Sequence, residues 1–134
     1  MTSEPHLKQE PIKPPSQWER DGVPVLAGFV EKRTKGVAGP PAMLLRVWCR
    51  WCCTWHTHGL ANALPGHYTD RSAHCYAPDS EYKQTGYWIL VTDTPYFVHR
   101  KTMKAATTRQ RSAIRAGRIS EAVQRLRDQP RPIG

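Results

Sequence analysis

The chain has 134 residues, a formal net charge of +9 and a mean hydropathy of −0.63, and hydrophobic residues make up 39% of it. This length allows one small domain with tails, whose core is thin for a globular protein. No run of 18 apolar residues is present, which excludes a membrane-spanning helix, and residues 1–20 hold no apolar run that could act as a signal peptide. We therefore expect a cytoplasmic protein, in a reducing environment where cysteines more often bind metal than form disulfides.

The first segment, residues 1–22, is polar. Such a segment buries too little apolar surface to offset the entropy lost on ordering, so we expect a disordered, proline-rich arm. Trp18 is the exception, because its large ring can dock on the domain or act as a short contact. The prolines of this arm are Pro5, Pro11, Pro14 and Pro15.

A β-rich, zinc-binding domain is expected over residues 23–98. Pro24 places its first strand at an edge or at a strand start. Residues 59–85 are rich in glycine and proline and predict loops, with a single helical turn at residues 70–75. β-Branched and aromatic residues predict strands at residues 23–30, 42–48, 54–60 and 86–93.

A tight turn is expected at residues 49–53, which joins the strands on either side into an antiparallel β-hairpin. The side chains of a strand alternate between its two faces. This period places His56 and His58 on one face of the returning strand, with Trp55 and Thr57 on the other.

The C-terminal segment, residues 99–134, is expected to be helical and basic. The helical pattern begins near Thr107, Gly117 can divide it into two helices, and Ser120 is a plausible N-cap of the second. Residues 101–134 carry nine Lys or Arg and two Asp or Glu, whereas residues 1–100 carry eleven and nine. A basic tail suits an anionic partner, most often nucleic acid, and the alternative is a solvated tail that aids solubility.

All four cysteines and four of the six histidines lie between Arg46 and Tyr76. Cys49 and Cys52 form a C-x-x-C pair, whose spacing lets two thiolates bind one ion from a tight turn, and zinc prefers tetrahedral thiolate and imidazole sites. Cys53 is expected to be a buried or half-exposed thiol, because it points away from its neighbour Cys52. We expect Zn²⁺ as the cofactor. Four protein ligands would fill its coordination shell, and its binding would contribute directly to folding.

Cys75 is the expected third ligand, and the fourth is left open among His58, His67 and His74. The rival interpretations of the C-x-x-C pair are a redox dithiol and a disulfide. A redox pair normally opens a helix after a strand, which the residues after Cys52 do not resemble. A zinc hydrolase or nuclease needs an open metal position and a carboxylate base, and Asp70 is the one acid within the cluster. We therefore expect no enzyme.

Aromatic and basic residues surround the cysteines. We expect Trp48 and Trp55 to pack in the core and Trp51, at the tip of the turn, to be an exposed contact residue. Exposed aromatics can stack on bases while arginines bind phosphates. Arg111, Arg115 and Arg118 stand at i, i+4 and i+7, which places them on one helix face. The expected nucleic-acid-binding residues are Arg50, Trp51, Arg109, Arg111, Arg115 and Arg118.

The elements "CRWC", "WHTHG", "RSAHC" and "TGYWI" resemble a group of short, largely uncharacterised proteins of actinobacteria, their phages and mobile elements. Those proteins carry a C-x-x-C, a W-H-x-H-G and an A-H-C element before a G-Y strand, and the resemblance covers residues 44–92. The group has a G-H-R before its A-H-C, from which the spacing of His67 and Arg71 departs. The resemblance implies no known activity, and it implies a zinc-bound module on Cys49, Cys52, His56, His58, His74 and Cys75.

The sequence thus predicts a small α+β domain, stapled by zinc, with a zinc-ribbon-like β-hairpin and a basic C-terminal helix. The leading expectation for function is a regulatory nucleic-acid-binding protein, with DNA as the partner, of an actinobacterial phage or mobile element. The alternative is a protein-binding module that acts on a host complex.

Overall fold

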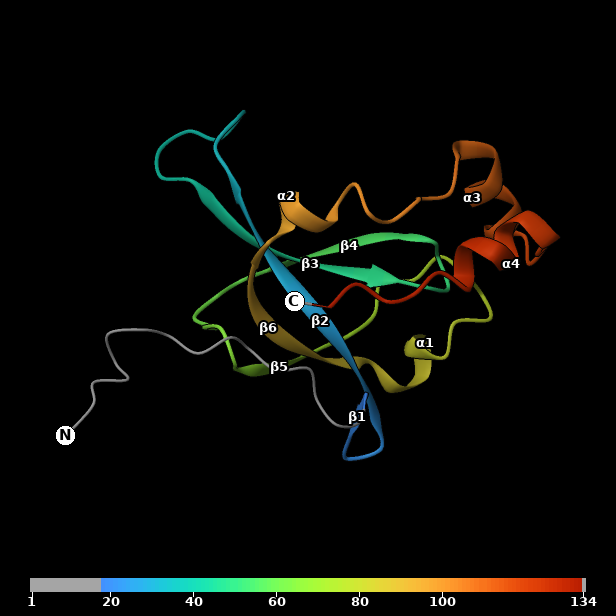
Figure 1. Cartoon of the computed structure of the whole chain (residues 1–134), viewed down its shortest axis with the longest axis horizontal. Coiled ribbons are helices and arrows are strands. Elements are labelled where there is room, and N and C mark those ends of the chain that lie inside the picture. The colour runs from blue at the N-terminus through green and yellow to red at the C-terminus, as the bar shows by residue number, and fades with distance from the viewer. Residues whose placement is uncertain (1–17, 134) are drawn as a thin grey trace.

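The computed structural model describes residues 18–133 of the chain (Figure 1). The expected arm of residues 1–22 lies mostly outside this described part. Residues 18–22 are ordered instead, because β1 (Glu19–Arg20) pairs antiparallel with the start of the next strand. Asp21 and Gly22 form the turn with φ values of 55° and 76°. An Asp-Gly pair favours such a hairpin turn.

A curled, mixed sheet forms the centre of the α+β fold (Figure 1). Its strand order is β4-β3-β2-β6-β5, with β1 beside β2. β2 and β6 run parallel, and all other neighbours are antiparallel. The strands are β2 (Val23–Arg33), β3 (Ala42–Cys49), β4 (Thr54–Gly59), β5 (Tyr68–Arg71) and β6 (Tyr87–Pro95).

The hairpin of β3 and β4 confirms the two strands and the turn expected between residues 42 and 60. Cys53 N–H donates to the carbonyl of Cys49 at 2.9 Å, and Cys53 has a positive φ of 55°. His56 and His58 are both buried while Thr57 is exposed, so the expected alternation of faces is also confirmed.

Strand β5 corrects the helical turn expected at residues 70–75. Asp70 and Arg71 lie in β5, which pairs with β6, and residues 72–77 have no regular structure. The strand is short and polar, so its own pattern does not predict it. It is held by β6 and by Arg20, whose guanidinium lies 4.3 Å from the ring centre of Tyr68 and 4.5 Å from that of Trp88.

The C-terminal segment forms two short helices, as the pattern around Gly117 predicted. Thr107 caps the first through a capping box with Gln110, Gly117 turns the chain with a φ of 77°, and Ser120 accepts a hydrogen bond from Val123 N–H at 3.1 Å. None of the described helices is long and apolar enough to cross a membrane. The helices are α1 (Tyr82–Thr85), α2 (Tyr96–His99), α3 (Thr108–Arg115) and α4 (Glu121–Arg127).

The core is divided between the two faces of β2. On one face, Ala27 and Phe29 pack with Tyr96, with Trp18 and Trp55 partly buried against them. On the other face lies the larger cluster, in which the buried residues of α3 and α4 meet the cysteine-bearing end of the β3–β4 hairpin. Its members from these elements are Cys49, Cys52, Cys53, Ile114, Val123 and Leu126. The C-terminal helices and the cysteines therefore belong to one buried cluster.

Candidate metal centre

Three of the candidate donors come from the β3–β4 hairpin. Cys49 ends β3, Cys52 lies in the turn, and His56 is the third residue of β4. Cys52 N–H points at the sulfur of Cys49, with a distance of 3.4 Å between Cys52 N and Cys49 Sγ. The turn therefore directs backbone N–H toward sulfur and both thiols toward the same side, as a metal-binding turn requires.

The segment after β5 supplies the fourth donor, Cys75. Its Sγ lies 3.7 Å from Cys49 Sγ and 3.7 Å from His56 Nε2. All four donor atoms, of Cys49, Cys52, His56 and Cys75, lie within 4.8 Å of one another. Cys49, Cys52 and His56 are buried, and Cys75 is partly buried. This closeness is sufficient for the four residues to hold one metal ion.

The spacing of the donors fits a tetrahedral ion. With Zn–S bonds of about 2.3 Å, two sulfurs on a tetrahedral zinc lie about 3.8 Å apart, close to the 3.7 Å between Cys49 and Cys75. The same distance is far longer than a disulfide bond of about 2.05 Å. All four cysteines are free thiols, so a disulfide is not the cross-link here.

Hydrogen bonds favour a thiolate at Cys75. Its pKa lies below its usual range because Cys49, first, and then Cys52 donate to its sulfur, and His56 and Ser80 add to the effect. The hydroxyl of Ser80 donates to Cys75 Sγ at 3.2 Å. The pKa of Cys49 is raised instead, by its hydrogen bonds to Cys52 and Cys75 and by burial. A bound cation would favour the thiolate form of these cysteines further.

The three histidines expected as possible ligands, His58, His67 and His74, lie outside the four-donor group. His58 Nε2 and the hydroxyl of Tyr87 share a hydrogen bond of 2.6 Å, and burial, first, with His74 next, lowers the pKa of His58 to about 4. His74 is exposed, with its ring centre 5.6 Å from that of His58. His67 is exposed in the turn before β5, where its Nδ1 accepts from Leu64 N–H at 3.3 Å.

The fourth donor is therefore His56, in place of the choice left open among His58, His67 and His74. Residue patterns placed His56 and His58 on the same face, and only the resemblance included His56 among the ligands. His56 and His58 differ in their distance from the turn that carries the thiols. Two residues of a strand span about 6.8 Å, so only the histidine nearer the turn reaches the thiols.

An ion pair between the buried Arg127 and the exposed Asp79 joins α4 to the segment that carries Cys75. The guanidinium of Arg127, which is 5% exposed, donates to both carboxylate oxygens of Asp79 at 2.6 and 2.9 Å. Tyr76, next to Cys75, donates its hydroxyl to the carbonyl of Cys52. These contacts join the fourth ligand segment to the hairpin turn and to the C-terminal helix.

Trp51 is not the exposed contact residue that the sequence predicted. Its indole is partly buried against the larger core cluster. The guanidinium carbons of Arg50 and Arg127 lie 5.0 and 5.3 Å from its ring centre, and the ring of Tyr82 packs edge-on at 6.5 Å. Trp48 is buried and Trp55 partly buried, in edge-to-face contact at 5.5 Å.

The expected row of arginines does not form one helix face. α3 ends at Arg115 and Gly117 turns the chain, so Arg118 lies beyond the helix. Arg111 is half-buried and donates to the carbonyl of Ala106 at 3.1 Å, while Arg115 lies 4.7 Å above the ring of Tyr76. Arg109 and Arg118 are exposed.

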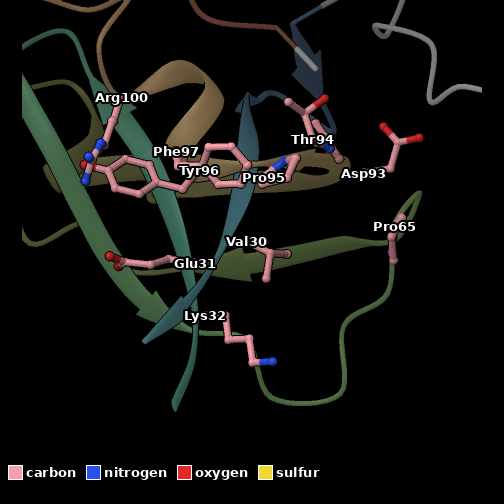
Figure 2. A pocket seen from close by; sticks show the side chains of 11 residues that line it. Val30, Glu31, Lys32, Pro65, Asp93, Thr94, Pro95, Tyr96, Phe97 and Arg100 are labelled. Atoms are coloured by element: carbon pink, nitrogen blue, oxygen red, sulfur yellow. Dashed lines mark hydrogen bonds between the residues drawn. The ribbon is translucent and has the colours of Figure 1, made fainter. Parts of the chain in front are cut away.

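A cavity that no cysteine lines opens beside α2 (Figure 2). It has a volume of about 570 Å³ and is lined by β2, β6 and α2, with Tyr96 and Phe97 as its aromatic wall. It contains no cysteine or histidine, and its acids are Glu31 and Asp93. The four candidate donors therefore do not line this cavity.

No protein-family model matches this chain, and neither does any curated protein or solved structure.

Proposed function

We propose that the four donors hold a structural Zn²⁺ and that the β3–β4 hairpin acts as a zinc-ribbon-like knuckle. Three thiolates and one imidazole suit zinc, and four protein donors fill a tetrahedral shell without a water molecule. The proposed metal therefore has a folding role and no catalytic one.

Metal analysis tests this part directly. Purified protein should contain one zinc per chain, and Cys49→Ser and Cys75→Ser should each lose it. Cys53→Ser is the matched control, because Cys53 is buried beside the cluster but is not one of the donors. A folded wild-type chain without any bound metal would refute the proposal.

We further propose that the protein binds nucleic acid, with DNA as the first candidate. The observation that carries this proposal is the uncompensated charge of the C-terminal segment. Of the nine Lys and Arg in residues 101–134, only Arg127 forms an ion pair within residues 18–133. Such a surface attracts polyanions, because binding releases the counterions held by phosphates.

The salt dependence of DNA binding tests the second part. For about four phosphate contacts, affinity for duplex DNA should fall roughly 100-fold between about 50 and 200 mM salt. The slope of log affinity against log salt concentration should become shallower in the triple variant Arg109→Gln, Arg118→Gln, Arg125→Gln. The control variant changes Lys32, Arg33 and Lys35 to glutamine, which removes the same number of positive charges and should affect the slope less. Absence of binding to duplex and single-stranded DNA at the lower salt would contradict the proposal.

A protein partner is the second candidate function, and the cavity in Figure 2 favours it. Its wall is largely apolar, and Phe97 is 68% exposed beside it. β3 pairs with β2 as far as Arg33, whereas β6 pairs with it only to Val30, so an edge of β2 is open next to the cavity within the described chain. Exposed apolar surface and an open strand edge both suit an extended peptide.

Capture of a partner protein from a nuclease-treated lysate tests this candidate. The captured complex should withstand high salt, and Phe97→Ser should abolish capture.

A further inference from the structure

A second, smaller cavity is surrounded by three arginines. It has a volume of about 250 Å³ and lies between the hairpin turn and the end of α4. Arg50 reaches it from the turn, Arg127 from α4, and Arg131 from the residues after α4, while Trp48 and Tyr82 contribute to its wall. Three guanidinium groups from separate parts of the chain thus meet at one hollow.

The charges of these arginines are not equally compensated. Asp79 neutralises Arg127 through its two hydrogen bonds. Arg50 and Arg131 form no ion pair within residues 18–133. One acid, Asp128, also lines the cavity; it is exposed and accepts a hydrogen bond from Gln124 Nε2 at 3.0 Å. The cavity therefore carries a surplus of positive charge.

Both unpaired arginines lie against aromatic rings. The guanidinium of Arg50 stacks on Trp51 at 5.0 Å, and that of Arg131 stacks on Trp18 at 4.4 Å. Stacking uses the flat face of a guanidinium, whereas its N–H donors lie in the plane and point outward. Each of these guanidinium groups contacts an aromatic ring, and neither forms an ion pair within residues 18–133.

The two like charges are also close enough to affect each other. Partial burial, first, and then the charge of Arg50 lower the pKa of Arg131 below its usual range. Two cations that face one hollow repel each other until an anion lies between them.

We infer that this cavity binds a phosphate group, held by the in-plane N–H donors of Arg50 and Arg131. Bidentate guanidinium pairing matches the tetrahedral oxygens of phosphate, and the volume admits one such group. The group can be free inorganic phosphate or a phosphate of a nucleic-acid backbone, and the second source rests on the nucleic-acid binding proposed above.

The first arm of the test uses inorganic phosphate and the full, metal-loaded chain at constant ionic strength. The arginine Nε–H resonances in ¹H–¹⁵N NMR spectra should shift in a saturable manner for Arg50 and Arg131. Arg131→Gln and Arg50→Gln should each abolish the saturable shift. Arg131→Lys should weaken phosphate binding at least fivefold, because lysine keeps the positive charge but lacks the paired N–H donors of a guanidinium. Arg125→Gln is the matched control, since Arg125 is exposed on α4 outside the cavity. A shift that grows linearly with phosphate, or one that survives Arg131→Gln, would overturn the inference.

The second arm uses a labelled duplex DNA. Arg50→Gln and Arg131→Gln should each weaken binding about tenfold more than Lys35→Gln, whose side chain is exposed and does not line the cavity, and should reduce the salt slope by about one. Saturable phosphate binding without DNA binding supports the cavity and refutes the nucleic-acid function. DNA binding that all three variants weaken equally, together with no saturable phosphate shift, refutes the cavity and leaves the nucleic-acid function standing.

Discussion

His56 and His58 show how a two-residue step along a strand separates a candidate metal donor from a histidine that bonds to a tyrosine. Both are buried on the same face of β4, where His56 pairs opposite Val47 and His58 opposite Leu45. His56 reaches the sulfur of Cys75, whereas His58 meets the hydroxyl of Tyr87. The residue pattern gives the shared face, but the distance to the thiols depends on where the turn ends. Sequence alone therefore left the choice of histidine open.

Replacing His56 tests this assignment at the residue scale. We expect His56→Gln to weaken zinc binding by more than about 100-fold, because loss of a ligand exceeds the 10–100-fold effect of losing a supporting contact. Competition with a metal chelator of known affinity measures the change.

The control for this prediction is His74→Gln, which removes an exposed imidazole outside the donor group. Its zinc affinity should match that of the wild type. Equal losses in both variants would mean that His56 has no special role.

At the scale of elements, the sequence predicted those parts whose signals are local. The strands around the turn, the break at Gly117 and the cap at Ser120 follow from nearby residues, and the structure confirms them. β5 was missed because its four residues gain their partners only when β6 lies beside them. The ordered hairpin at residues 18–22 was not predicted, because its Asp-Gly turn signal lies within a polar segment.

Gly28 allows the neighbouring strands of the sheet to approach β2. A Cβ added at this position would lie 2.4 Å from Cγ2 of Ile89 and 2.9 Å from Cδ1 of Leu45. We expect Gly28→Ala to lower the free energy of unfolding by about 1–3 kcal/mol through overpacking. Denaturant unfolding of the metal-loaded protein measures the loss.

The matched control is Gly59→Ala, also in a strand, where an added Cβ meets no atom within 4 Å. Its stability should stay within about 0.5 kcal/mol of the wild type. If both alanines cost the same, the close approach at Gly28 does not limit the packing.

The pair of Asp79 and Arg127 couples α4 to the segment of Cys75. We expect Asp79→Asn to lower the free energy of unfolding by about 1–3 kcal/mol, because it leaves the buried Arg127 without its partner. The loss is smaller than for a fully buried pair because Asp79 is partly exposed. Asp93→Asn is the control, since Asp93 is exposed on β6.

The pH dependence of this pair has a definite sign. Hydrogen bonds from Arg127 hold the pKa of Asp79 below its usual range, so the pair stabilises the fold above the unfolded value of about 3.9 and loses that effect as the pH falls through the folded value. The difference in unfolding free energy between wild type and Asp79→Asn should therefore be constant from about pH 5 to 8. A difference that vanishes within this range would contradict the assignment.

At the scale of the whole molecule, the candidate donor cysteines and the C-terminal helices share one core. Ile114, Val123 and Leu126 pack in the same cluster as the buried cysteines. The sequence indicated separate units, a zinc domain and a basic tail, because each has its own composition. Their union depends on long-range contacts, such as those of Asp79 with Arg127, that no local pattern encodes.

Metal removal should therefore affect the entire fold. A structural zinc contributes about 10–16 kcal/mol to folding, which equals or exceeds the total stability of a typical domain. We expect chelation to abolish the near-ultraviolet dichroism of the packed tryptophans and to expose the amides of α3 and α4 to hydrogen exchange. Retention of helix protection in the chelated protein would show that the helices do not depend on the metal centre.

The parallel pairing of β2 with β6 has a consequence for the folding kinetics. Val25 lies opposite Trp88 across some sixty residues of intervening chain, whereas Cys49, Cys52 and His56 are close neighbours in sequence. Short loops close early and long ones late, because the entropy of loop closure grows with length. A zinc ion captured by the hairpin would restrict the intervening chain before the central strands meet. We therefore expect refolding at low zinc to slow down at the step that joins β2 and β6, while formation of the hairpin keeps its rate.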